Sequence, residues 1–118
     1  MKYLCLIYQD ESLGQTLPRA ELDSVLAEYL SFTARLKGSG EYLGSNRLQP
    51  AQTATTVKVR EGKVLTTDGP FVETKEQLGG YYLIEAKDLN AAIQIASKIP
   101  SARFGSIEVR PVWEIPQG

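Results

Sequence analysis

The residues best suited to chemistry gather in one segment near the middle of the chain, residues 66–82. This segment contains Asp-Gly-Pro at positions 68–70. A carboxylate at a strand end beside a pocket can act as a general base, especially where burial raises its pKa, so Asp68 is the candidate catalytic residue. Asp-Gly-Pro is also turn chemistry, in which the carboxylate caps backbone N–H groups. The two roles do not exclude each other.

Four further residues are candidates for binding a small ligand near this aspartate. Two of them belong to the charged stretch that follows the motif, where a lysine could hold an anionic group if the stretch formed a lip over a cleft; a solvated loop is the alternative. The other two lie near expected strand ends. The four ligand-binding candidates are Tyr8, Arg47, Glu73 and Lys75.

Many kinds of active site are excluded by the residues that the chain lacks. It has no histidine, which rules out a Ser-His-Asp or Cys-His mechanism and any histidine-ligated metal. The single cysteine, Cys5, cannot form an internal disulfide or a structural zinc site, and it lies in an apolar run where a thiol is buried and inert. No phosphate-binding or dinucleotide-binding glycine motif is present. We therefore expect neither a metal nor a cofactor.

Length and charge narrow the class of protein. The chain has 118 residues and a net charge of −1, which suit one domain over residues 1–118. Because nucleic-acid binders concentrate basic charge and this chain does not, we expect no nucleic-acid partner. The longest apolar run, residues 3–8, is too short to span a membrane, and no secretion signal precedes it. The prediction is a cytoplasmic protein with no membrane contact.

Hydrophobic periodicity predicts the elements that position these residues. Helical spacing and glycine, proline or aspartate boundaries predict helices over residues 18–36 and 89–99. Alternating or continuous apolar runs predict strands over residues 2–8, 41–48, 55–60, 63–67, 81–86 and 106–115.

The order of these elements is β-α-β, an inserted hairpin, then β-α-β. This order predicts an α+β fold of the ferredoxin-like kind, a split βαβ arrangement with an inserted β-hairpin and with both helices on one face of the sheet. Pro111 supports the arrangement, because a proline cannot donate to a strand ladder and the last strand of this fold is an edge.

Two of the predicted strands, residues 3–8 and 81–86, are apolar on both faces. Strands of this kind are covered on two sides, but two helices can cover only one. Leaving four or five such side chains in water would forgo roughly 8–12 kcal/mol. We therefore predict a homodimer packed sheet to sheet. The alternative is that the inserted hairpin folds back over the open face.

The central segment reads Asp68-Gly69-Pro70-Phe71, then Val72, then Glu-Thr-Lys-Glu-Gln-Leu-Gly-Gly over residues 73–80. It resembles the DGPF motif of the YciI-like (YCII-related) proteins, and the similarity extends over nearly the whole chain. The resemblance implies a dimeric α+β barrel built from ferredoxin-like units. The wider superfamily is proposed to include enzymes with a histidine and an aspartate in a cleft, of which only Asp68 has a counterpart here. It also implies a regulatory link, because the DGPF subgroup is often encoded beside extracytoplasmic-function sigma factors.

Two functions follow from these observations. The first is a small dimeric protein that binds a small organic molecule in a cleft near Asp68, with cofactor-free acid–base chemistry as an option. The second is a non-catalytic regulatory protein that acts through a partner such as a sigma factor. A closed cavity that holds the Asp68 carboxylate would favour the first, and a carboxylate pointing into solvent would favour the second.

Overall fold

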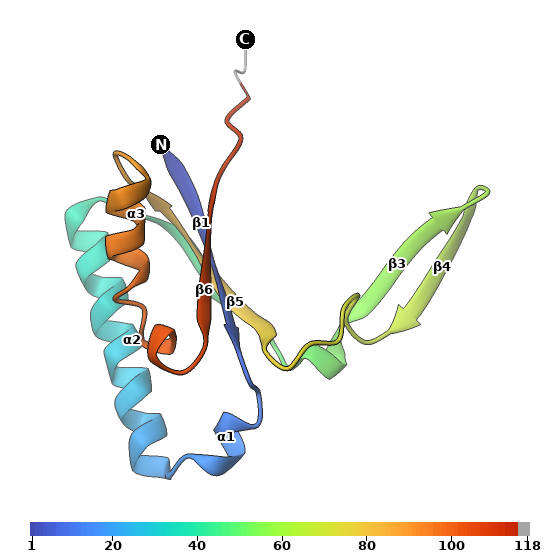
Figure 1. Ribbon diagram of the computed structural model, residues 1–118, viewed down its shortest axis with the longest axis horizontal. Coiled ribbons are helices and arrows are strands. Elements are labelled where there is room, and N and C mark those ends of the chain that lie inside the picture. The colour runs from blue at the N-terminus through green and yellow to red at the C-terminus, as the bar shows by residue number, and fades with distance from the viewer. Residues whose placement is uncertain (116–118) are drawn as a thin grey trace.

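A four-stranded sheet, two helices on one of its faces and a separate two-stranded hairpin make up the computed structural model, which describes residues 1–115 (Figure 1). The strands are β1 (Lys2–Gln9), β2 (Tyr42–Arg47), β3 (Thr55–Arg60), β4 (Lys63–Asp68), β5 (Gln77–Glu85) and β6 (Ser106–Pro111). The helices are α1 (Leu13–Thr16), α2 (Arg19–Ser39) and α3 (Leu89–Ala96), with short 3-10 turns η1 (Ala51–Thr53) and η2 (Pro100–Arg103).

The sheet has the strand order β2-β5-β1-β6, and each neighbouring pair is antiparallel. This is the order of a split βαβ fold with the hairpin inserted between β2 and β5, so the predicted ferredoxin-like α+β class is confirmed. Pro111 lies at the end of β6, which is an edge strand, as its missing N–H requires.

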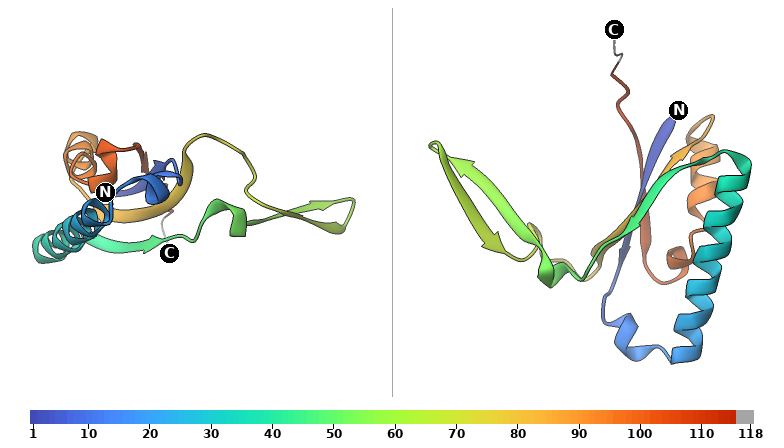
Figure 2. Two further views of the ribbon diagram at one scale, coloured as in Figure 1. Left: turned by 90° about the horizontal axis from the view of Figure 1, so that it is seen from below. Right: turned by 180° about the vertical axis from the view of Figure 1, so that it is seen from behind.

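The core lies between one face of the sheet and the two long helices (Figure 2). Alternate residues of the central strands point into it, among them Cys5 and Ile84, which are fully buried. Phe32 and Leu36 of α2 and Ile95 of α3 cover them. No helix within residues 1–115 covers the opposite face of the sheet. Side chains such as Leu4 and Leu83, which are directly opposite each other on β1 and β5, are only half-buried there.

The helix ends follow the predicted boundary residues. Gly40 ends α2 in the left-handed region, with φ of 81°, where a residue with a Cβ would be strained. Asp88 begins α3, and its side chain accepts a hydrogen bond of 2.8 Å from the backbone N–H of Ala91. The amphipathic α3 then buries its apolar stripe against the sheet.

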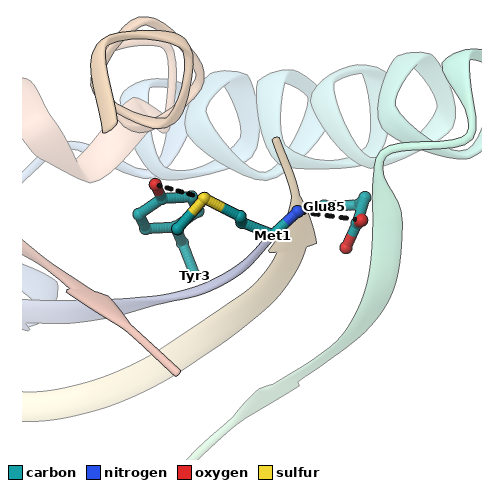
Figure 3. Close-up of polar contacts among 3 residues, drawn as sticks. All are labelled: Met1, Tyr3 and Glu85. Carbon is teal, nitrogen blue, oxygen red and sulfur yellow. Dashed lines mark hydrogen bonds and ion pairs between the residues drawn. The ribbon is translucent and has the colours of Figure 1, made fainter. Parts of the chain in front are cut away.

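A polar contact joins the start of β1 to the end of β5. The Met1 ammonium lies 3.0 Å from a carboxylate oxygen of Glu85, and the Tyr3 hydroxyl donates to the Met1 sulfur at 3.8 Å (Figure 3). Both charged groups of the ion pair are at least half exposed, so the pair adds little stability.

The hairpin of β3 and β4, which we call the arm, projects away from the sheet and helices (Figures 1 and 2). Its two strands pair only with each other, through a turn at Glu61 and Gly62. The alternative in which the hairpin folds back over the open face of the sheet is therefore wrong.

One extra helix and several element boundaries differ from the prediction. α2 continues through Gly38 to Ser39, beyond the expected end at residue 36, and α3 ends at Ala96, before the expected end at residue 99. The polar segment after β1 contains the one-turn helix α1, which is too short to show a hydrophobic period. β5 begins four residues before the expected position 81, because the strand passes through Gly79 and Gly80 instead of starting after them. β6 ends at Pro111, so Trp113, expected on the strand, lies beyond it with 90% of its surface exposed.

Candidate functional site

A cleft of about 580 Å³ opens between α2 and the helix-covered face of the sheet. α2 forms one wall with apolar side chains, and the ends of β2 and β5 form the other, while α1 and η2 close its sides. The residues used below line it: Asp23, Tyr29, Thr33, Arg47, Tyr82 and Ser101.

Hydroxyl groups form the polar interior of the cleft. The Tyr29 hydroxyl and Ser101 Oγ share a hydrogen bond, and Thr33 Oγ1 lies 2.6 Å from the Tyr82 hydroxyl. The rings of Tyr29 and Tyr82 are stacked, with their centroids 6.5 Å apart and their planes 3° from parallel. The two tyrosines therefore hold each other and present a flat aromatic surface with polar ends.

Burial sets the protonation state of these phenols. Desolvation raises the pKa of Tyr29 above its ordinary value, against opposing hydrogen bonds from Ser101 and a smaller effect of the Arg47 charge. Desolvation likewise raises the pKa of Tyr82, and the Thr33 hydrogen bond opposes it. Both phenols are consequently neutral near pH 7 and act as hydrogen-bond donors and acceptors, not as bases.

Two charged side chains line the cleft, Arg47 at the end of β2 and Asp23 on α2. Both are exposed, and neither makes an ion pair with any residue within 1–115. The arginine therefore offers an unpaired guanidinium, the one positive charge of the lining, at the edge of a space whose other lining groups are mainly apolar side chains and hydroxyls. Such a group binds a carboxylate or another planar anion through two parallel hydrogen bonds.

The base of the arm is fastened to the loop after β1, near this end of the sheet. Both carboxylate oxygens of Glu11 accept from the backbone N–H of Ala51 at 3.0 Å, and Gln77 Oε1 accepts from the Glu11 N–H at 3.2 Å. These bonds fix where the chain leaves β2 for the arm and where it returns to β5.

Of the predicted site residues, Arg47 lies on the cleft and the others do not. Tyr8 alternates with Ile7 along β1 and so lies on the open face of the sheet. Glu73 and Lys75 are exposed in the segment that returns from the arm. Lys75 lies close to Asp10, whose pKa is lowered first by hydrogen bonds from Ser12 and less by the lysine charge.

Asp68 ends β4 at the base of the arm and is exposed. Within residues 1–115 the turn after it is held by other groups. The Gly69 N–H donates to the Ala54 carbonyl at 2.7 Å, and Thr56 Oγ1 donates to the Gly69 carbonyl at 2.9 Å. Gly69 has a φ of 98°, as predicted for a turn of this type. One chain thus does not bring Asp68 to the cleft, and the exposed carboxylate is the outcome stated above as favouring the regulatory alternative over a ligand cleft around Asp68.

The tyrosine, serine and threonine hydroxyls and the aspartate of α2 were not predicted as site residues. Tyr29 and Thr33 share the helical period of the core positions, and the sequence gives no sign that they border a cleft. Within the described part of the chain, no three side chains of His, Cys, Asp or Glu are placed to hold a metal ion. Over the same residues, no helix is long and apolar enough to cross a membrane.

Comparison with known proteins agrees with this fold. The chain is 35% identical over 114 residues to an uncharacterised protein of Rhizobium meliloti (strain 1021), an alignment that covers 95% of this chain and 92% of that protein. A solved structure, 5-chloro-2-hydroxyhydroquinone dehydrochlorinase from Burkholderia phenoliruptrix AC1100 in complex with 2,5-dihydroxybenzoquinone, superposes with a TM-score of 0.55. That match covers 97% of this chain and 94% of the other at 15% identity, which shows a shared fold.

A family model supplies the assignment. The model of the YCII-related domain matches residues 1–116, which is nearly the full length of the chain. The finer placement in the DGPF subgroup stays a prediction from the central motif. The chain belongs to the family of proteins with a YCII-related domain.

Proposed function

We propose that the protein binds a small, planar organic molecule with an acidic group in the cleft between α2 and the sheet. The cleft carries this proposal, because its volume of about 580 Å³ lies within the roughly 300–1,000 Å³ of small-molecule sites. Its walls are mainly apolar and aromatic, with a few convergent polar groups, as such sites require.

The positions of these polar groups favour an aromatic acid or a hydroxyquinone. Tyr29, which is half-buried and backed by the buried Tyr82, offers a ring against which an aromatic ligand can pack, and its neutral hydroxyl can bond to a ring oxygen. Arg47 supplies the one positive charge among the lining residues and pairs with a carboxylate or an ionised hydroxyl. The complex of the dehydrochlorinase with 2,5-dihydroxybenzoquinone supports the choice of this compound class as the first probe.

A thermal-shift screen with small aromatic acids and hydroxyquinones tests the proposal. A ligand present at 100 times its Kd should stabilise the fold by ~2.7 kcal/mol, a shift of about 10 °C for a domain of this size. Arg47→Gln should then raise the Kd of an acidic hit roughly 10–100-fold, because a hydrogen bond to a charged group is lost. Titration calorimetry measures the change.

Arg60→Gln is the matched control, since Arg60 is exposed on the arm and its guanidinium donates only to the adjacent Val59 carbonyl. Its affinity for the ligand should equal that of the unmodified protein. The uncharged methyl ester of the hit should bind the Arg47→Gln variant and the unmodified protein equally. Failure of every compound to stabilise the protein, or equal affinity of both arginine variants for the acid, would contradict the proposal.

We also propose that the protein acts as a homodimer through the open face of its sheet. Leu4, Leu6, Tyr81 and Leu83 share that face by their register and are only half-buried in one chain. Covering the remaining half of four such side chains would yield roughly 3–6 kcal/mol before the cost of association. A two-fold dimer covers the same patch on both copies.

The roles of Asp68, Tyr8, Glu73 and Lys75 in ligand binding or acid–base chemistry stay proposals. Tyr8 lies on the proposed dimer face, and the other three belong to the arm or to the segment that leads from it. Their part in a site therefore depends on where the arm lies in the assembly.

A further inference from the structure

The two faces of the arm differ in chemistry. Residues directly opposite in an antiparallel pair share a face, and here Val59 pairs with Val64, Val57 with Thr66, and Thr55 with Asp68. One face therefore carries all three valines of the arm, toward its tip, with polar residues nearer the base; its members are Thr55, Val57, Val59, Val64, Thr66 and Asp68. The other face carries most of the positive charge: Thr56, Lys58, Arg60, Lys63, Leu65 and Thr67.

Among the described residues 1–115, the three valines of the apolar face are left exposed. Val57, Val59 and Val64 are 60%, 58% and 69% exposed. A two-stranded hairpin alone is at best marginally stable in water, and an exposed apolar hairpin invites aggregation. An arm of this composition requires a surface against which the three valines can pack.

The dimensions of the whole chain show how much more surface it exposes than a compact domain of the same length. Its accessible surface is 8574 Å², whereas a compact monomer of 13.0 kDa exposes about 6,300 Å². Its radius of gyration is 16.5 Å, against about 13.5 Å for a compact domain of this length. The excess surface, roughly 2,200 Å², is more than twice the ~800 Å² that each partner buries in a standard interface.

We infer that the apolar face of the arm binds a second copy of this chain. This goes beyond the ligand cleft, which lies within one chain, and beyond contact between the two sheet faces. Each copy has two uncovered apolar surfaces, the open sheet face and the arm. In a two-fold dimer, the arm of each copy can lie against the body of the other. A second copy of the chain then covers both the open sheet face and the apolar face of the arm.

The same packing changes the setting of Asp68. Its register places it on the apolar face, at the base of the arm, in line with Thr55 and Thr66. When that face binds the partner, Asp68 is carried to the contact between copies. The aspartate of the central motif then belongs to the interface and not to the solvent that surrounds it in a single chain.

Two neighbouring residues on opposite faces of β4 test the inference. Val64→Glu places a carboxylate in the proposed contact, and Leu65→Glu places one on the opposite face of the same strand, where the side chain is 49% exposed. Val64→Glu should raise the dimer dissociation constant by about 10-fold or more, because an unpaired charge is disfavoured in an apolar contact. Leu65→Glu should leave the dissociation constant unchanged. Analytical ultracentrifugation over a dilution series measures both.

A measurement on the unmodified protein tests the same contact without any substitution, so misfolding of a variant cannot affect it. Backbone amides of β3 and β4 should exchange slowly with deuterium in concentrated samples and faster after dilution below the dissociation constant. Equal effects of the two substitutions, or no effect of Val64→Glu, would overturn the arm contact and leave the sheet-face dimer standing. A monomer at micromolar concentration would overturn both contacts, and the ligand screen would still test the cleft independently.

Discussion

Burial changes the acid–base chemistry of the Cys5 side chain. It has no exposed surface, and desolvation raises the pKa of its thiol to about 11, from an ordinary value near 9.0. The thiolate is therefore negligible near neutral pH, which agrees with the prediction of an inert core cysteine.

This raised pKa predicts a loss of stability in alkaline solution. The thiol of the unfolded chain releases its proton at a lower pH than the thiol of the folded protein. The contribution of the thiol to the free energy of unfolding is therefore complete below about pH 9 and is lost as pH rises through 11. The resulting loss in the free energy of unfolding is about 2–3 kcal/mol, at 1.36 kcal/mol per pKa unit. Urea unfolding at a series of pH values measures it.

Cys5→Ala is the control for this pH dependence. The variant should be less stable at pH 7, because a buried sulfur is removed, and it should lack the thiol's share of the decline between pH 9 and 11. The raised pKa values of Tyr29 and Tyr82 add a decline of the same sign above about pH 10, which the variant should retain. An unchanged pH profile in Cys5→Ala would contradict the assignment.

At the scale of elements, the approach of η2 and β6 to β1 depends on Gly105. A Cβ at this position would lie 2.0 Å from the Tyr8 carbonyl oxygen and 2.9 Å from the Gln9 Cα. Neither backbone atom can move without displacing the strand. The glycine thus allows the chain to turn from η2 into the edge strand at this distance.

Gly105→Ala should lower the free energy of unfolding by about 3 kcal/mol, because the added methyl overlaps backbone atoms. Gly38→Ala is the matched control: its site in α2 has open space around the added Cβ, and alanine favours the helix by roughly 0.5–1 kcal/mol. The two substitutions should shift the urea midpoint in opposite directions. A neutral Gly105→Ala would mean that the two backbone segments do not approach as closely as the structure shows.

The elements were predictable because their signals are local. The helix ends at Gly40 and Asp88 and the edge position of Pro111 follow from single residues. β5 was predicted too short, since two glycines in a row resemble a break. Gly80 is instead needed inside the strand, where a Cβ would lie 2.8 Å from the Asn46 carbonyl oxygen.

The cleft was not predictable in the same way. Tyr29, Arg47 and Ser101 come from three separate elements, and their meeting depends on how α2 and η2 pack on the sheet. The central motif was the most specific local pattern in the sequence, so the predicted site was centred on Asp68. Alternation along β3 and β4 predicts a hairpin but carries no information on the direction in which the hairpin points.

For the whole molecule, the open sheet face gives a test of the proposed homodimer. Leu83→Glu places a charge at the centre of that face, opposite Leu4, and should leave the protein a folded monomer at concentrations where the unmodified protein is expected to dimerise. Ile93→Glu is the control, because Ile93 is 45% exposed on α3 and lies outside the proposed contact. Sedimentation equilibrium distinguishes the two, and a dimer that tolerates Leu83→Glu would exclude this face.

Trp113 is the single tryptophan of the chain, and it follows the edge strand with its indole open to water. The intrinsic fluorescence of the protein above the tyrosine band therefore arises from one known position. A single exposed indole emits at long wavelength and is readily quenched by iodide. A ligand or protein that binds over the end of β6 should shift the Trp113 emission to shorter wavelength and shield the indole from iodide. The protein therefore contains an intrinsic fluorescent reporter of binding at this end of the sheet.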